Sequence, residues 1–370
     1  MSSPALPSEL ASLARAVTEG CTECRACLFR CAFLNEQGSP AHLARQVLEQ
    51  HASPQSLAPA FHCALCGLCH AICPLGLPMA ELFLAMRREA MRRDLVDLRP
   101  YRPLLTYERA GRSRFFADRI IPPGCDTVLF PGCTFPGTRP ETLLALLRHL
   151  RASRPGLGVV LDCCTKPSHD LGRQDVFYAA FASLRDDLLQ RGVRRVLTIC
   201  PNCHDIFVRY GHGLEIQSVA SALAKTPRPH ERTVHAHGVQ HIPCPLRGNE
   251  HEIGAIRTLA RRSGLTLEPL KHKGRQSPCC GEGGAVGRVR PDLSAAWGER
   301  CRVRVGTHPL LTSCAGCESY LHSRVTTIHV LDLYFFPRRT MAGRKPARGW
   351  RTYLNRLLLR IRLRRNMSSS

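Results

Sequence analysis

The cysteines of this 370-residue chain are gathered into a few short motifs, and they constrain the fold more than any other feature. Of the twenty cysteines, eighteen fall into two runs near the N-terminus and two matching sets further along. Residues 1–20 hold no apolar stretch that would direct secretion, and no run of eighteen apolar residues follows. We therefore expect a cytoplasmic protein, in which so many reduced cysteines indicate metal binding.

The two N-terminal runs share the spacing C-x2-C-x2-C-x3-C, which is that of bacterial ferredoxins. They consist of Cys21, Cys24, Cys27 and Cys31, and of Cys63, Cys66, Cys69 and Cys73, the second run being followed by proline. The spacing predicts two cubane [4Fe-4S] clusters, because three thiolates at three-residue steps can hold three corners of one cube. Zinc is the alternative, but zinc sites usually have paired C-x2-C motifs that lie further apart.

The fourth ligand of each predicted cubane comes from the other run. In two-cluster ferredoxins the last cysteine of each run binds the second cluster. One predicted ligand set is therefore Cys21, Cys24, Cys27 and Cys73, and the other is Cys63, Cys66, Cys69 and Cys31. This crossing would bring the two clusters close together.

Helical spacing surrounds these runs and predicts a small helical module. Apolar residues recur at helical intervals over 41–50 and over 79–97. Four arginines of the second segment, at 87, 88, 92 and 93, are interpreted as a solvated helix face, with a docking patch as the alternative. We place this module at residues 1–100, and the proline-rich segment 101–124 is predicted to be a linker.

The second half of the chain contains an internal repeat. Each copy has a single cysteine, then a Cys-Cys pair, then a C-x2-C motif, and equivalent cysteines lie roughly 110 residues apart. The first copy consists of Cys133, Cys163, Cys164, Cys200 and Cys203. The second consists of Cys244, Cys279, Cys280, Cys314 and Cys317.

Each copy is expected to fold as a small α/β domain. Short apolar segments at 127–130, 159–161 and 196–199 alternate with helical patterns at 141–151 and 176–191, and 310–313 resembles 196–199. Alternation of this kind favours a parallel sheet, with the cysteines gathered at the carboxyl ends of its strands. The predicted domains are 125–232 and 233–338. A thioredoxin-like dithiol is the alternative for each C-x2-C motif, but it leaves the other three cysteines unexplained.

The pattern of single cysteine, Cys-Cys pair and C-x2-C resembles the cysteine-rich CCG domain of heterodisulfide reductase and its relatives. Those relatives include iron–sulfur subunits of glycolate oxidase, lactate-utilisation enzymes and anaerobic glycerol-3-phosphate dehydrogenase. The resemblance implies that each five-cysteine set holds a noncubane [4Fe-4S] cluster, and that a substrate disulfide is split between the two. Two departures stand out, since Thr165 takes the place of the glycine after the first pair, and residues 241–245 match the reductase's second motif only loosely.

Several other residues carry weaker signals. The stretch 281–287 is glycine-rich, but it lacks the strand–turn–helix setting of a dinucleotide site, so close backbone approach to a cluster is the preferred interpretation. His235, His237 and His241 are interpreted as strand and loop residues, with a second metal site as the alternative. Residues 162, 166, 282 and 288 flank the cysteine pairs and are candidates for proton handling. The leftover Cys125 and Cys301 are expected to be buried thiols.

The C-terminal tail, 339–370, carries much of the formal net charge of +23. Trp350, Tyr353, Leu354, Leu357, Leu358 and Ile361 form one helical stripe among arginines. This predicts a basic amphipathic helix at a membrane surface. A helix that binds an acidic partner subunit, or one that packs on the last domain, is the alternative. We expect no nucleic-acid binding, because no recognition motif accompanies the charge.

Together these features predict an α+β multidomain protein: a two-cubane ferredoxin module, two duplicated CCG domains and a basic helix. We expect an iron–sulfur electron-transfer subunit of an oxidoreductase, similar to heterodisulfide reductase, with the tail as a candidate peripheral contact to the inner face of the membrane. Because the chain has no flavin or nicotinamide fingerprint, it should exchange electrons with a flavin- or cytochrome-containing subunit. A relay from a flavin dehydrogenase to the quinone pool, and a zinc-binding structural protein, are the alternatives.

Overall fold

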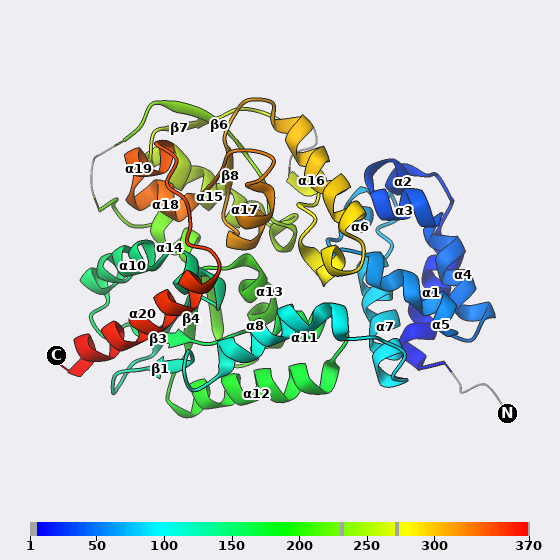
Figure 1. The fold of residues 1–370 in the computed structure, drawn as a ribbon, viewed down its shortest axis with the longest axis horizontal. Helices are drawn as coiled ribbons and strands as arrows, with labels where there is room; N and C mark the ends of the chain where they lie inside the picture. The colour runs from blue at the N-terminus through cyan, green and yellow to red at the C-terminus, as the bar shows by residue number, and fades with distance from the viewer. Residues whose placement is uncertain (1–5, 230–232, 271–273, 369–370) are drawn as a thin grey trace. The chain divides into compact units, whose positions relative to one another are not determined.

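A computed structural model describes residues 6–229, 233–270 and 274–368 of the chain (Figure 1). Its internal contacts divide it into two compact units. The first unit consists of Met1–Leu105, Pro167–Phe177 and Leu270–Gly306, and the second of Thr106–Lys166, Tyr178–Pro269 and Thr307–Ser370.

The first unit is helical. Its elements are α1 (Ser8–Gly20), α2 (Ala26–Arg30), α3 (Ala32–Gln37), α4 (Pro40–Glu49), α5 (Pro54–Leu57), η1 (Ala58–His62), α6 (Leu68–Ile72), α7 (Met79–Arg92), η2 (Arg99–Tyr101), η4 (Gly274–Gln276), η5 (Gly283–Arg288) and α16 (Pro291–Val305). The helices predicted over 41–50 and 79–97 are confirmed as α4 and α7, although α7 ends at Arg92. Asp94, just beyond that end, has a φ of 56°, a left-handed conformation that does not continue a helix.

The core of the first unit joins segments that are far apart in sequence. Leu82, Phe83 and Met86 of α7 pack in one apolar cluster with Val286 and Trp297. The last two residues belong to the glycine-rich stretch and to α16, which lie inside the second cysteine repeat. Sequence repeats show which segments are duplicated but not which segments pack together, and this explains why the units cross the predicted repeat boundaries.

The first sheet of the second unit has the strand order β1-β3-β2-β4-β5. Its strands are β1 (Asp118–Ile120), β2 (Thr127–Phe130), β3 (Gly158–Leu161), β4 (Arg195–Thr198) and β5 (Glu215–Ser218). All neighbours are parallel except β1, which runs antiparallel to β3. The strands predicted over 127–130, 159–161 and 196–199 are therefore confirmed, with β4 shifted by one residue.

The second sheet repeats this arrangement with four parallel strands in the order β7-β6-β8-β9. They are β6 (Ala236–Gln240), β7 (Leu265–Leu267), β8 (Leu310–Thr312) and β9 (Thr327–His329). In both sheets the strand before the single cysteine lies between the strand that follows it in sequence and the strand before the C-x2-C motif. The two sheets share one apolar core, which includes Leu129, Leu197, Leu311 and Ile328.

Helices flank both sheets. They are α9 (Thr134–Thr138), α10 (Pro140–Ser153), α12 (Gln174–Gln190), α13 (Pro201–Tyr210), α14 (Val219–Ala224), η3 (Cys244–Leu246), α15 (Glu250–Arg262), α17 (Ala315–Leu321), α18 (Val330–Phe335) and α19 (Pro337–Met341). The short α11 (Lys166–Asp170) belongs to the first unit except for its first residue. The predicted helices over 141–151 and 176–191 are confirmed as α10 and α12, and α13 and α17 begin directly after Cys200 and Cys314.

The segment 101–124, predicted to be a linker, is ordered. It contains helix α8 (Arg102–Arg112) and strand β1, which pairs with β3. Leu105 and Gly111 are buried, so part of α8 packs into the protein despite its polar composition. The proline-rich composition that suggested a linker marks the ends of these elements, since Pro103 lies in the first turn of α8, where proline is tolerated.

The tail forms helix α20 (Trp350–Ser368), drawn in red in Figure 1. It packs within the second unit against α9 and, to a lesser extent, β1 and α10. Among its residues whose burial the structure describes, Thr352, Arg356, Leu359 and Leu363 are buried. In the described part of the chain, no helix is long and apolar enough to cross a membrane.

Candidate iron–sulfur centres

The two N-terminal cysteine runs have the same unusual backbone. Glu23 and Leu65, each two residues after the first cysteine of its run, have φ values of 53° and 51°. Arg25 and Gly67, two residues further on, have φ values of 62° and 64°. Non-glycine residues adopt this left-handed conformation at a cost of about 1–2 kcal/mol, so it persists only where the surroundings impose it.

In the second run, this backbone turns a peptide N–H group toward a thiol. The N–H of Leu65 donates to Sγ of Cys63 at 3.4 Å. This hydrogen bond favours a negatively charged sulfur, because it lowers the pKa of the Cys63 thiol against the effect of burial. The cysteine spacing predicted the ligands, but it did not reveal this repeated left-handed backbone pattern.

The thiols interact in two crossed groups. Burial raises the pKa of Cys27 to about 11. The nearby thiols of Cys21, Cys24 and Cys73 contribute to this increase. Burial also raises the pKa of Cys31 to about 12, with Cys66 as the principal neighbouring thiol. The pKa of Cys63 is raised by burial and then by Cys31 and Cys66. The last cysteine of each run therefore lies beside the other run.

A cavity opens at the first of these groups. Cys21, Cys24, Cys27 and Cys73 all line it, together with Pro74 and Leu77. The cavity lies within the first unit and brings the four thiols of one predicted cubane to a single space.

The glycine-rich stretch lies against the second cysteine run. A Cβ added at Gly283 would meet the carbonyl oxygen of Ala64 at 2.4 Å, and one added at Gly284 would meet that of Cys63 at 2.5 Å. The predicted close approach is therefore to the backbone that carries a predicted cluster ligand. Residues 283 and 284 have no room for a side chain.

Arg87 corrects the interpretation of the α7 arginines as a solvated face. Its side chain is fully buried, and its guanidinium donates to four backbone carbonyls, those of Ala60, Cys63, Asp170 and Gly284. Burial lowers the pKa of Arg87. Arginine recurs four times in α7 and the residue after it, and only tertiary packing distinguishes this buried one from the more exposed Arg92.

The second Cys-Cys pair belongs to the first unit. The thiol of Cys279 is in hydrogen-bond contact with those of Cys280 and Cys66, and these contacts raise its pKa together with burial. Cys66 is a predicted cubane ligand, so a residue of one predicted centre touches a residue of another.

The first five-cysteine set gathers at the carboxyl ends of β2, β3 and β4. Sγ of Cys163 lies 3.8 Å from Sγ of Cys133. The thiol of Cys203 is in hydrogen-bond contact with Cys164 and Cys200, and these contacts raise its pKa. A Cβ at Gly132, which has a φ of 73°, would lie 2.9 Å from Sγ of Cys203, so the backbone closes tightly around the thiols.

The backbone conformation of the residue after each Cys-Cys pair explains why the CCG motif has a glycine at this position. Thr165 has a φ of 54° and Gly281 a φ of 96°. The N–H of Gly281 donates to Sγ of Cys279 at 3.3 Å, and the N–H of Thr165 makes the equivalent bond to Cys163. Glycine adopts a left-handed conformation without strain, whereas a β-branched threonine does not.

The two C-x2-C motifs meet within the second unit. Cys200 and Cys314 each precede the first turn of a helix. Hydrogen bonds from Cys203 and Cys314 lower the pKa of Cys200, although burial opposes them. The two five-cysteine sets therefore share a thiol contact through this pair.

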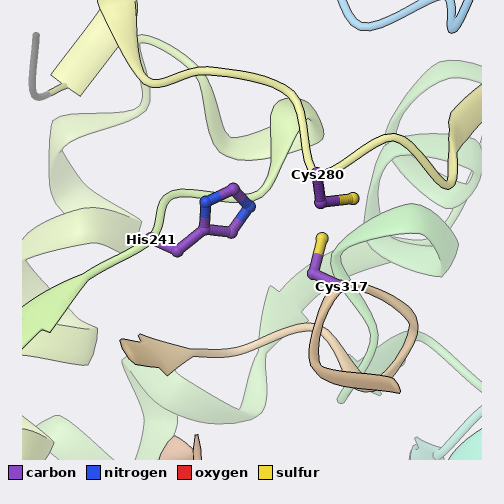
Figure 2. Close-up of side chains that lie close together, drawn as sticks. All are labelled: His241, Cys280 and Cys317. Atoms are coloured by element: carbon purple, nitrogen blue, oxygen red, sulfur yellow. The ribbon is translucent and has the colours of Figure 1, made fainter. Parts of the chain in front are cut away.

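A histidine lies beside the second C-x2-C motif. Figure 2 shows His241 with Cys317, and the ligand atoms of these two buried residues lie within 4.8 Å of each other. Nδ1 of His241 is buried and has no hydrogen-bond partner in the described part of the protein. His241 directly follows β6, which agrees with its interpretation as a strand or loop residue. Its closeness to a cysteine could not be predicted from the sequence. Cys280 is also drawn in Figure 2 and belongs to the first unit.

The chemistry of these residues fits iron–sulfur clusters. All twenty cysteines are free thiols, so none is used in a disulfide. The ligand groups consist of converging thiols, with tight glycines and N–H donors around them. Thiols that raise one another's pKa resist ionising alone, whereas a bound metal centre ionises coordinating thiols outright.

The remaining candidate residues are not among the predicted cluster ligands. Cys125 and Cys301 are buried, as predicted, and donate to the carbonyls of Thr127 and Cys279. Asp162 accepts a 2.7 Å hydrogen bond from the N–H of Cys163, and burial raises its pKa. Proton handling by residues 162, 166, 282 and 288 stays a prediction.

Comparison with protein families agrees with this arrangement. Residues 17–77 match the 4Fe-4S dicluster domain, and residues 127–207 match the cysteine-rich CCG domain. The chain is thus an iron–sulfur electron-transfer protein that combines a dicluster ferredoxin domain with a CCG domain.

Curated relatives specify this class further. The chain is 24% identical over 343 residues to a subunit of the CoM/CoB fumarate reductase of Methanothermobacter marburgensis, covering 82% of this chain and 67% of the relative. It is 24% identical over 295 residues to a subunit of the dihydromethanophenazine:CoB–CoM heterodisulfide reductase of Methanosarcina barkeri, covering 70% and 71%. An uncharacterised iron–sulfur protein of Methanococcus maripaludis is 21% identical over 83% of this chain and 68% of its own length. The predicted likeness to heterodisulfide reductase is confirmed.

Proposed function

We propose that this chain carries electrons between two cubane clusters and two CCG-type clusters of a heterodisulfide reductase-like oxidoreductase. Iron–sulfur clusters supply one-electron transfer at potentials that the protein sets. The proposed cubane ligands are the crossed sets Cys21, Cys24, Cys27, Cys73 and Cys63, Cys66, Cys69, Cys31. The proposed CCG ligands are Cys133, Cys163, Cys164, Cys200, Cys203 and Cys244, Cys279, Cys280, Cys314, Cys317.

The observation that carries this proposal is the contact between the thiols of Cys66 and Cys279. A proposed ligand of the second cubane thus touches a proposed ligand of the second CCG centre. Arg87 links the segments that carry these two ligands, because it donates hydrogen bonds to the carbonyls of both Cys63 and Gly284. Contact between ligands of adjacent centres favours electron transfer between them.

The likeness between the two sheets supports a second CCG-type centre at the second five-cysteine set. Both sheets have the same parallel strand order around the strand that precedes the single cysteine. The N–H to thiol hydrogen bond after the Cys-Cys pair also recurs, at Thr165 and at Gly281. We infer that the two domains arose from one unit and bind the same kind of group.

A disulfide is the proposed substrate class. The thiol contact between Cys200 and Cys314 lies where the two CCG ligand sets meet, which suits a substrate with two adjacent sulfur atoms. Reduction breaks the sulfur–sulfur bond, consumes two electrons and two protons, and gives two thiols. The electrons would come from a flavin- or cytochrome-containing partner subunit.

The alternative function is a relay from a flavin dehydrogenase of glycolate, lactate or glycerol-3-phosphate type to the quinone pool. The sequence has no flavin or nicotinamide fingerprint, so this function also requires a partner. A third candidate, a zinc-binding structural protein, would need the same thiols to hold zinc.

The outer face of α20 supports peripheral binding to an anionic membrane. Its buried residues, such as Leu359 and Leu363, lie on one side, and the predicted apolar stripe lies on the opposite side. Trp350 and Leu358 are 69% and 53% exposed, and Arg351 and Arg362 beside the stripe are also exposed. Apolar side chains flanked by arginines complement anionic headgroups above acyl chains.

The proposed function is tested on protein that has been purified without oxygen and reduced with dithionite. Electron paramagnetic resonance is recorded before and after addition of CoB–CoM heterodisulfide or a quinone analogue, and released thiols are counted. The proposal predicts a changed cluster signal and two thiols released per disulfide. Oxidation by the quinone analogue alone, with no thiol released, would favour the relay.

Membrane binding is tested separately by sedimentation with phosphatidylglycerol-containing vesicles. The full chain should sediment at low salt, and a Leu358→Glu variant should not. An unchanged variant, or binding to a partner subunit without vesicle binding, would assign this face to a protein contact.

A further inference from the structure

Arg356 is the one buried arginine of helix α20, among the residues whose burial the structure describes. It is 4% exposed, while neighbours on the same helix such as Arg351 and Arg362 face solvent. Its guanidinium lies 5.4 Å from the ring centroid of Tyr107 and 4.9 Å from that of Phe116. The two aromatic rings hold the cation in place and keep water away from it.

This cation has no acidic partner among the residues that the structure describes. Nη1 of Arg356 is buried without a hydrogen-bond partner, whereas Arg360 and Arg364 of the same helix both pair with Asp118. An unpaired buried charge is strongly unfavourable. A negatively charged group close to Arg356 would remove this penalty.

The guanidinium lies at the first five-cysteine set. The position of a Cβ built on Gly111 is 3.3 Å from Nη2 of Arg356, 3.1 Å from Cβ of Cys163 and 3.4 Å from Cβ of Cys133. Gly111 therefore marks a point where the arginine and two of the cysteines converge. Tyr107, which stacks on Arg356, also donates from its hydroxyl to the carbonyl of Cys133 at 3.2 Å.

We propose that Arg356 is the counter-charge of the first CCG centre and raises its reduction potential. Five thiolates around an iron–sulfur group leave it net negative, and each added electron increases that charge. A nearby cation stabilises the reduced form more than the oxidised form. Helix α20 would then be part of the redox centre as well as a surface element, so docking of the tail would be linked to the potential. This inference rests on the proposed function of the cysteine set.

The test is a potentiometric titration of the purified holoprotein followed by electron paramagnetic resonance. The signal of the first centre is identified as the one that a Cys133→Ala variant lacks. We compare wild type with Arg356→Gln, Arg356→Lys and the exposed control Arg194→Gln, whose residue precedes β4 at the end of the strand away from the cysteines. At a fixed potential, Arg356→Gln should lower the reduced-to-oxidised ratio of this centre at least tenfold, which is about 59 mV for one electron. Arg356→Lys should keep most of the wild-type value, and Arg194→Gln should match wild type.

Iron content separates a charge effect from a folding effect. Loss of iron in Arg356→Gln with retention in Arg356→Lys would support the counter-charge. Loss in both variants, or an unchanged potential in Arg356→Gln with full iron, would overturn it and leave Arg356 a structural role. If wild type has no signal that Cys133→Ala removes, the proposed cluster site itself is wrong.

Discussion

Nη2 of Arg87 donates a 2.6 Å hydrogen bond to the backbone carbonyl of Cys63. The same side chain holds carbonyls from two segments more than 80 residues away in sequence, at Asp170 and Gly284. One buried guanidinium thus fixes the second cysteine run against parts of both repeats, all within the first unit.

Replacement of Arg87 by glutamine should strongly destabilise the first unit. Carbonyls left buried without a donor cost about 1–3 kcal/mol each, so we expect a loss of at least about 3 kcal/mol in the free energy of unfolding. Urea denaturation of the holoprotein measures it. Arg92→Gln is the control, since this residue is largely exposed and pairs with Glu89, and it should cost less than about 1 kcal/mol. Equal effects of the two variants would contradict the role of Arg87.

The crossed ligation of the cubanes can be tested with paired alanine variants and iron counts. If the sets are crossed, Cys24→Ala combined with Cys73→Ala removes one cluster, about four irons. Cys24→Ala combined with Cys31→Ala then removes two clusters, about eight irons. Uncrossed ligation predicts the reverse, so the two double variants are controls for each other.

Thr165 and Gly281 should respond oppositely to substitution. Thr165→Gly removes the strain of a left-handed threonine, which stabilises the folded state by about 1–2 kcal/mol. This gain offsets the roughly 0.5–1 kcal/mol by which glycine loses more backbone entropy on folding. It should therefore leave stability unchanged or raised. Gly281→Ala should destabilise, because its φ is 96° and its Cβ would lie 2.4 Å from the carbonyl oxygen of Ser294. Thermal unfolding of both variants checks this, and a stable Gly281→Ala protein would contradict the steric argument.

Attachment of helix α20 to its unit should weaken in acid. Asp118 is partly buried, which by itself raises its pKa, but hydrogen bonds from Arg364 and Arg360 hold the pKa below its usual value. A carboxyl whose pKa is lower in the folded state stabilises that state above its unfolded pKa of about 4, and this contribution is lost as the pH falls through the folded pKa. Proteolysis of the tail should thus accelerate below about pH 4. Asp118→Asn should show fast cleavage already at neutral pH, and slow cleavage of that variant would argue against the contact.

Cysteine spacing predicted much of this protein because the motifs are local. The strands before Cys133, Cys163 and Cys200 and the helices after the C-x2-C motifs follow from alternation and apolar runs over a few residues. Resemblance to the CCG domain then explained why a Cys-Cys pair recurs. These features need no knowledge of which distant segments meet.

What the sequence did not reveal depends on tertiary packing. Arg87 and Arg356 look like their exposed neighbours, and only the folded chain buries them beside cysteine-containing loops. The apolar stripe of the tail is a similar case. Its periodicity predicts a helix, but the residues that pack inward, such as Leu359 and Leu363, lie on the side opposite the most apolar stripe.

The most direct test of the central claim is the content of iron, acid-labile sulfide and zinc per chain after anaerobic purification. Two cubanes and two CCG-type clusters predict about sixteen irons, a similar amount of sulfide and no stoichiometric zinc. Zinc bound to the thiols without sulfide would contradict the assignment of this chain as an iron–sulfur electron-transfer protein.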